Sequence, residues 1–416
     1  MTKQERTAWT LAAALFVSLF FIWGVAYDCF PILLPSIRGQ FNLSREQIGW
    51  VPAAQALAAL MFAPMVGWLL DRVQAQIVMS VGVVLTAIGI AMMARAGSFQ
   101  GVIVGSAFTG AGLSASTILP STMVISNWFG ERRGMALGVT TAGMELGGMA
   151  LAIAAGVLVV THGWRFTYAV LAIPLVAIVL PLCLGFVRTR PERPADISTT
   201  ETPDETYVPS APPGLEVDEA LRTRAFWMLI VLQFCYTFAI GGSFIHLVQY
   251  LIGIGYTEAS GKWVIGSSLG LALIGKPAMG FLGDRIGGKN ALALCLLIGS
   301  LNTAFVLFAR NLWVLVIFTI VGGLTGSAPI ALGPMVQVET LGLRRYGSIA
   351  GIFAIPFSLG AMLGPPIVGR IADMTGNYSV SFEVCAIIGM VGAVASFFCV
   401  RPDEARIGGL VEANQE

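Results

Sequence analysis

The chain has 416 residues, of which 56% are hydrophobic and 11% are charged, and its mean hydropathy is +0.80. Soluble globular domains of ordinary composition are far more polar, so the surroundings of this chain must be lipid. The net charge is only +1 and the basic residues form no cluster, which argues against nucleic-acid binding.

The apolar residues fall into twelve runs, each about long enough to cross a bilayer core of about 30 Å as a helix. The predicted spans are residues 9–33, 47–70, 76–95, 99–126, 134–160, 164–187, 225–253, 258–283, 289–309, 311–338, 345–369 and 378–400. The first run is too long for the hydrophobic region of a signal peptide, so we expect it to be retained. The sequence therefore predicts an all-α membrane protein.

A polar stretch at residues 188–224 divides the spans into six and six. It contains six prolines and eight acidic residues, so it cannot bury enough apolar surface to fold alone, and we expect a flexible linker. The expected domains are an N-terminal bundle at residues 1–187 and a C-terminal bundle at residues 225–416.

Lysines and arginines are distributed unequally between the two sides of the membrane. Sixteen fall on the side that holds the termini and the linker, and seven on the other, with the difference resting on the tails and linker. Because positive charge favours the cytoplasmic side, we expect both termini and the linker in the cytoplasm. Helical spans without a targeting extension lead us to expect a multi-pass protein of a bacterial inner membrane.

A short motif ends the second span and recurs at the end of the eighth. Its shared residues are Gly67, Asp71 and Arg72 in the first copy and Gly280, Asp284 and Arg285 in the second. The glycine allows close helix contact, and the aspartate can accept hydrogen bonds from a neighbouring helix N-terminus or pair with arginine. We expect these residues to gate the cytoplasmic end, with Asp284 mattering more because its copy continues into Gly287 and Lys289.

This repeat resembles the loop signature of the major facilitator superfamily, Gly-x-x-x-Asp-Arg-x-Gly-x-Lys/Arg. Residues 128–138 and the segment Lys276-Pro-Ala-Met-Gly280 resemble monocarboxylate and oxalate transporters of that superfamily. The resemblance implies twelve transmembrane helices in two pseudo-symmetric six-helix bundles and transport by alternating access. It also places Lys276 where those transporters have a carboxylate-binding arginine, whereas Ile32 and Ala272 replace charged residues found in many animal members.

Three ionisable residues lie deep in the predicted spans: Asp28, Glu145 and Lys276. Each costs roughly 2.5–3.5 kcal/mol in the membrane, so each needs a task or a partner. We interpret Lys276 as a cation for a substrate carboxylate, with a structural salt bridge as the alternative. Asp28 and Glu145 are interpreted as proton-coupling carboxyls, with simple pairing as the alternative. Tyr27 could also hydrogen-bond the substrate carboxylate.

The leading hypothesis is secondary active transport of a small monocarboxylate, proton-coupled, because one membrane cation matches one carboxylate. The alternative is efflux of an organic cation or drug by proton antiport, because the two acids outnumber the lysine. A lysine that faces the cavity favours the first, and a lysine locked to an acid favours the second. A transporter-like sensor without flux is a third possibility, which a long signalling extension would favour.

Enzymatic and nucleotide-driven activities are not expected. Residues 270–276 match the spacing of a phosphate-binding loop, but Pro277 stands where serine or threonine is required and no soluble strand precedes it. We therefore expect no nucleotide, cofactor or metal. The expected partners are a small carboxylate, a proton and the lipid bilayer.

The predicted topology can be tested with protease on oriented membrane vesicles. Residues 188–224 should be spared in right-side-out vesicles and cut in inverted ones, because the linker is expected in the cytoplasm. Fragment masses read by mass spectrometry decide the outcome, with detergent-solubilised protein as the control that is cut in either case. The opposite pattern would reverse the orientation.

Overall fold

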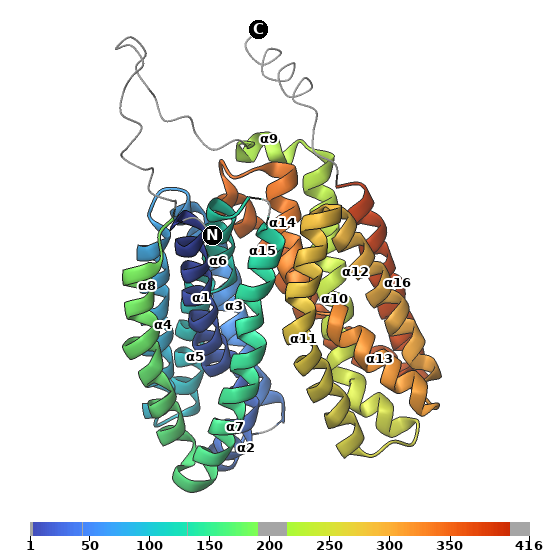
Figure 1. Ribbon diagram of the computed structural model, residues 1–416. Helices are drawn as coiled ribbons and strands as arrows, with labels where there is room; N and C mark the ends of the chain where they lie inside the picture. The colour runs from blue at the N-terminus through green and yellow to red at the C-terminus, as the bar shows by residue number, and fades with distance from the viewer. Residues whose placement is uncertain (1–2, 44, 131, 190–213, 400–416) are drawn as a thin grey trace, which may run out of the picture.

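The computed structural model describes residues 3–43, 45–130, 132–189 and 214–399. This part of the chain is almost entirely helical, and its β-structure is limited to one isolated bridge between Gly214 and Gly342. The helices form two bundles side by side, one from the first half of the chain and one from the second (Figure 1). The predicted all-α membrane fold is therefore confirmed.

The first bundle contains α1 (Lys3–Trp23), the π-helix η1 (Gly24–Asp28), α2 (Phe30–Phe41), α3 (Arg45–Leu70), α4 (Ala75–Arg95), α5 (Phe99–Ser116), α6 (Ile118–Trp128), α7 (Arg133–Pro174), the π-helix η2 (Leu175–Val179) and α8 (Leu180–Phe186). A short helix, α9 (Val217–Leu221), precedes the second bundle. That bundle contains α10 (Arg224–Gly253), α11 (Glu258–Ile286), α12 (Gly288–Phe305), the 3-10 turn η3 (Val306–Phe308), α13 (Leu312–Thr325), α14 (Pro329–Leu341), α15 (Tyr346–Thr375) and α16 (Ser379–Phe397).

Eleven helical stretches of the described chain are long and apolar enough to cross a membrane. The longest, Arg133–Phe186, holds two spans, because Gly163 leaves helical geometry with φ 78° and ψ 167° and the chain turns back there. Figure 1 shows α7 descending to this turn and the chain returning through α8. Glycine fits the turn because it has no Cβ to clash at positive φ. The twelve predicted spans are thus all present, with ends shifted by a few residues.

Four spans are interrupted. The first and the sixth contain the π-helices η1 and η2, and the fourth breaks at Thr117, which has φ −113° and ψ −119°. The tenth breaks between α13 and α14, so the fourth span of each half is discontinuous at a related place. Breaks in transporter helices commonly lie at binding sites, because they leave backbone groups without helical partners.

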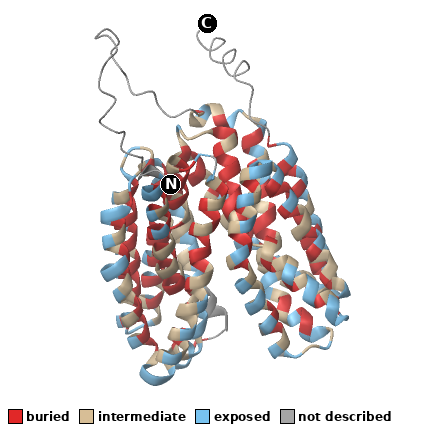
Figure 2. Cartoon of the chain, in the orientation of Figure 1, coloured by how far each residue is buried: buried red, intermediate tan, exposed pale blue. Residues whose placement is uncertain are grey.

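The two halves meet at one end of the molecule and spread apart towards the other (Figure 1). We call the end that carries α9, the start of α1 and the end of α16 the linker end, and the opposite end the distal end. At the linker end the backbones touch: a Cβ on Gly280 would overlap the carbonyl oxygen of Gly134, and one on Gly67 would overlap that of Gly347. Figure 2 shows buried residues concentrated where the halves meet and more exposed residues towards the distal end.

Part of the predicted linker departs from the flexible chain expected for it. Residues 190–213 lie outside the described chain, but residues 214–221 pack on the turn between α14 and α15. Leu215 donates its N–H to the carbonyl oxygen of Leu341 at 2.9 Å, and α9 begins with a capping box formed by Glu216 and Glu219. The first residue of a capping box is usually Ser, Thr, Asp or Asn, so Glu216 in that place gave no recognisable helix-start signal in the sequence.

The glycine contact between the halves gives a prediction for Gly280→Ala. The added methyl group has no room beside Gly134, so the linker end should open, at an overpacking cost of about 1–3 kcal/mol. The distance between nitroxide labels at Gln74 and Asn290, one on each half, should lengthen. Gly299→Ala is the matched control, because no atom lies within 4 Å of its new Cβ. Unchanged distances in both variants would contradict the packing argument.

Candidate functional site

A buried ion pair joins the two halves between α7 and α11. The ammonium of Lys276 donates a hydrogen bond to Oε1 of Glu145 at 2.6 Å and lies 3.5 Å from the carbonyl oxygen of Thr141. The Lys276 side chain is fully buried, whereas that of Glu145 is 16% exposed. Such a pair is stable only while both charges stay together, because either one alone would lack compensation.

Small residues bring these helices close enough for the pair to form. Gly138 of α7 packs directly on the backbone of Lys276, one helical turn beyond the contact between Gly134 and Gly280. On the opposite side of α11, Gly275 packs on the backbone of Leu324 in α13. The lysine is therefore enclosed by backbone, and its stem can only extend along α7 towards Glu145.

Asp28 lies at the end of η1, within electrostatic range of both Glu145 and Lys276. Its Oδ2 occupies the space beside Gly148, about one turn along α7 from Glu145. No hydrogen bond to the Asp28 side chain occurs within the described residues. The side chain of Gln55 on α3 donates to the carbonyl oxygen of Ala26 at 3.1 Å, which satisfies backbone in the π-helix. The structure thus brings together all three predicted membrane charges.

The ring of Tyr27 contacts Trp23 rather than the ion pair. Its side chain is 55% exposed and stacks on Trp23, with ring centroids 4.9 Å apart. Within the described residues it makes no hydrogen bond to the three charged residues, and of these it lies within electrostatic range of Asp28. Its role in substrate binding stays a prediction.

Tyr236 on α10 is a neighbour of the site that the sequence did not single out. Its hydroxyl donates to the carbonyl oxygen of Gly326 at 3.0 Å, at the break between α13 and α14, and it interacts electrostatically with Glu145. The hydroxyl of Ser327, beside this break, is buried without a hydrogen-bond partner in the structure. Nothing local to the sequence marks these residues, because their position depends on how three helices pack. Among the described residues, no cluster of histidine, cysteine and acidic side chains could hold a metal ion.

The repeated aspartates cap helices of the opposite half at the linker end. Asp284 of α11 accepts the N–H groups of Gly134 and Met135 at 2.6 and 2.8 Å, at the start of α7. A carboxylate is favoured there by the partial positive charge of a helix N-terminus.

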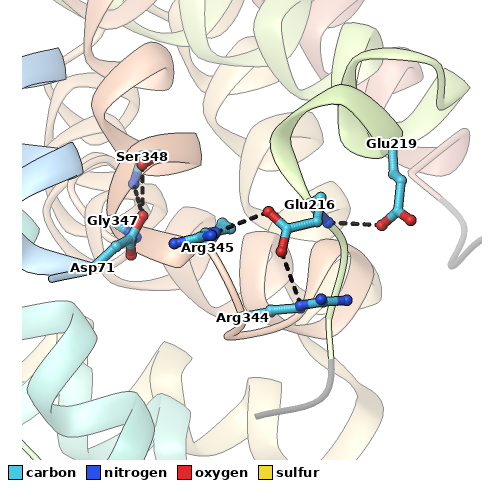
Figure 3. Close-up of polar contacts among 7 residues, drawn as sticks. All are labelled: Asp71, Glu216, Glu219, Arg344, Arg345, Gly347 and Ser348. Atoms are coloured by element: carbon cyan, nitrogen blue, oxygen red, sulfur yellow. Dashed lines mark hydrogen bonds and ion pairs between the residues drawn. The ribbon is translucent and has the colours of Figure 1, made fainter. Parts of the chain in front are cut away.

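Asp71 of α3 does the same at the start of α15. It accepts the N–H groups of Gly347 and Ser348, both at 2.8 Å, and the Ser348 hydroxyl at 2.6 Å (Figure 3). The incomplete first copy of the motif therefore makes one contact more than the complete second copy. Of the two partners expected for the aspartates, the helix N-terminus is the one observed.

The motif arginines lie against their own helices. Arg72 lies over the ring of Trp68 at 4.0 Å and Arg285 over that of Phe281 at 4.7 Å, each one turn earlier. A charge that the sequence did not single out is Glu339 of α14, which accepts the N–H of Gly288 at the start of α12 at 3.1 Å. Arg133 interacts electrostatically with both Glu339 and Asp284, so the linker end contains further charges around the cap.

The described chain thus forms two helical bundles, each of which caps a helix of the other at the linker end. The sequence matches the family model of the Major Facilitator Superfamily at residues 11–274 and 253–415, and the chain belongs to this superfamily of transporters, which are not enzymes. The family predicted from the repeated motif is confirmed.

Relatives and solved structures match nearly the whole chain. Monocarboxylate transporter 13 of Bos taurus is 24% identical over 399 residues, which cover 94% of this chain and 90% of the relative. The fosmidomycin resistance protein of Escherichia coli K12 is 24% identical over 403 residues, covering 95% and 94%. FucP, the Escherichia coli fucose:proton symporter, matches in its outward conformation with a TM-score of 0.75 and 18% identity, covering 94% of this chain and 98% of FucP.

The capping contacts predict the effects of Asp71→Asn and Asp284→Asn. Each removes a charge from a helix N-terminus, so the linker end should close less firmly and transport should slow more than equilibrium binding weakens. The complete second motif predicts the larger effect for Asp284→Asn. The three hydrogen bonds of Asp71, however, lead us to expect an effect of Asp71→Asn that is at least as large. Turnover and substrate affinity measured on the same reconstituted variants test this, and unchanged turnover in both would discard the gating role.

Proposed function

We propose that the protein is a proton-coupled symporter of a small monocarboxylate, with the linker end facing the cytoplasm of a bacterium and the spans in its inner membrane. The observation that carries the proposal is the fully buried ammonium of Lys276 between the two halves, although its pairing with Glu145 is the arrangement expected of the cation alternative. A cation whose acidic partner can be displaced is suited to exchanging a protein carboxylate for a substrate carboxylate.

In the proposed cycle the resting site is electrically balanced by Lys276 and Glu145. The substrate carboxylate takes the place of Glu145 on the ammonium, and the freed Glu145 carboxyl takes up one proton. Lysine binds a carboxylate as a point charge, so the site would tolerate several carboxylate orientations. Anion and proton then cross together without net charge movement, which avoids leaving an unpaired charge in low dielectric.

Asp28 is proposed as the second proton-coupling carboxyl. It lies one turn from Glu145 along α7 and within electrostatic range of the pair, yet it has no hydrogen-bond donor within the described residues. A carboxyl in this position can take a proton when the cavity is dry and release it when water enters. It could therefore pass protons between Glu145 and the distal end.

The relatives also support this proposal. Monocarboxylate transporters 11, 12 and 13 of mammals match most of the chain, with identities of 28%, 23% and 24%. The resemblance seen in the sequence at residues 276–280 implies that Lys276 stands where those transporters have an arginine. The substrate class proposed here rests on that substitution preserving a positive charge.

Efflux of an organic cation or drug by proton antiport is the second candidate, and a specific observation favours it. Lys276 is locked to Glu145, which was the feature expected of that alternative, and within the described residues Asp28 makes no ion pair. The fosmidomycin resistance protein and an efflux protein for agnestins are also among the relatives. A cation would bind Asp28 and displace a proton from it.

Transport in liposomes separates the two proposals. Lys276→Ala should abolish proton-driven accumulation of monocarboxylate, and Lys276→Arg should retain part of it. Glu145→Gln or Asp28→Asn should leave carboxylate exchange but impair proton-driven accumulation. Uptake of labelled acid and an internal pH-sensitive dye, read together, measure both fluxes, and wild-type uptake should rise as the external pH falls.

Controls separate lost function from lost folding. Lys276→Ala leaves Glu145 unpaired, at a cost of roughly 3–5 kcal/mol when a buried pair is broken, so the double variant Lys276→Met with Glu145→Gln is measured beside it. Arg310→Ala removes an exposed cation outside the helices and should transport normally. Wild-type accumulation by Lys276→Ala, or a wild type that binds only amines, would rule out the carboxylate proposal and favour the cation.

A further inference from the structure

Residues 214–221, called the strap below, fasten the end of the linker to the second half beside the gate. Gly214 forms a bridge with Gly342, and the N–H of Leu215 bonds the carbonyl oxygen of Leu341. Leu215 is buried, and so is Ala220 of α9. These contacts hold the strap on the turn that connects α14 to α15.

Glu216 binds both arginines of this turn. Its carboxylate accepts Nε of Arg344 at 3.0 Å and Nε of Arg345 at 2.8 Å, one oxygen for each (Figure 3). The three side chains are 36–44% exposed, so these are surface ion pairs that add little to global stability. Their position is more informative than their strength, because Arg345 is the N-cap residue immediately before α15, which begins at Tyr346.

Arg345 lies between two carboxylates that belong to different halves. Figure 3 shows it with Glu216 of the strap on one side and Asp71 of α3 on the other. The hydrogen bond that Arg345 donates to Glu216 and, more weakly, the negative charge of Asp71 raise the pKa of its guanidinium. Asp71 itself is occupied by the N–H groups of Gly347 and Ser348, two and three residues further along.

We propose that Glu216 is a positioning residue of the linker-end gate, acting through Arg345 to hold the start of α15 where Asp71 can cap it. With Arg345 drawn to the strap, both oxygens of Asp71 are left for the backbone of α15. Without Glu216, the guanidinium is free to compete for Asp71, and the turn that presents Gly347 and Ser348 loses one of its two attachments. The strap therefore favours the conformation closed at the linker end.

The inference rests on the proposed gating role of Asp71 and is independent of the substrate. It also predicts a salt effect, because exposed ion pairs are screened within about 8–10 Å at physiological ionic strength and more strongly above it. Raising salt should open the linker end of the wild type and have less effect once Glu216 is neutral.

Electron-spin distances between nitroxides at Gln74 and Asn290 measure the opening directly and need no substrate. The six native cysteines are buried, so the labels can be placed in an otherwise unaltered chain. Glu216→Gln should raise the ratio of open to closed conformations roughly two- to fivefold, the range of an exposed ion pair. Asp218→Asn is the matched control, because it removes the same charge from an exposed position of α9 that forms neither ion pair.

Two further variants distinguish positioning from a general loss of structure. Arg345→Gln should open the linker end less than Glu216→Gln does, because it breaks the contact with the strap without leaving a guanidinium free to compete for Asp71. In an Asp71→Asn background the Glu216 change should add nothing. A distance distribution for Glu216→Gln equal to that of Asp218→Asn, or an equal shift in the Asp71→Asn background, would overturn the inference. If Asp71→Asn itself leaves the distances unchanged, the gating proposal fails as well, so the two failures are separable.

Discussion

Two backbone contacts, Gly67 on Gly347 and Gly280 on Gly134, bring the halves of the protein closer together than side chains would allow. That closeness puts the first N–H groups of α7 and α15 within reach of an aspartate from the other half. Helix N-termini carry unsatisfied donors, which need a partner where water is scarce. In the described structure the glycine contacts and the two aspartate caps therefore occur together at the linker end.

The same geometry also explains where the two halves differ. One turn beyond the glycine contact, α7 packs Gly138 on Lys276, and the equivalent contact between α15 and α3 packs Gly351 on Ala63. The helices cross closely in both places, but only the crossing of α7 with α11 holds a charged residue. A buried lysine at such a crossing is sensitive to the separation of the helices, so the chemistry of the site is tied to the conformation of the scaffold.

How much the sequence could predict depends on how local each signal is. Spans are set by apolar length, so their ends were predicted to within a few residues, and Gly163 already marked the turn between two of them. The cost of burial singled out Asp28, Glu145 and Lys276, which the structure brings together. By contrast, the pairing of Lys276 with Glu145 rather than Asp28, and the approach of Tyr236 and Arg345, depend on contacts between segments far apart in the chain, which no local pattern encodes.

The linker is attached to the rest of the protein at both of its described ends. Thr189 accepts the N–H of Ala75 at the start of α4 at 2.8 Å, and Leu215 is bonded to the turn before α15. From Thr189 to Gly214 the chain advances by 25 residues, which reach at most about 80–90 Å if fully extended. A covalent connection of this length does not by itself hold the two halves in contact. Their contact at the linker end therefore depends on noncovalent interactions, such as the glycine contacts and the capping aspartates.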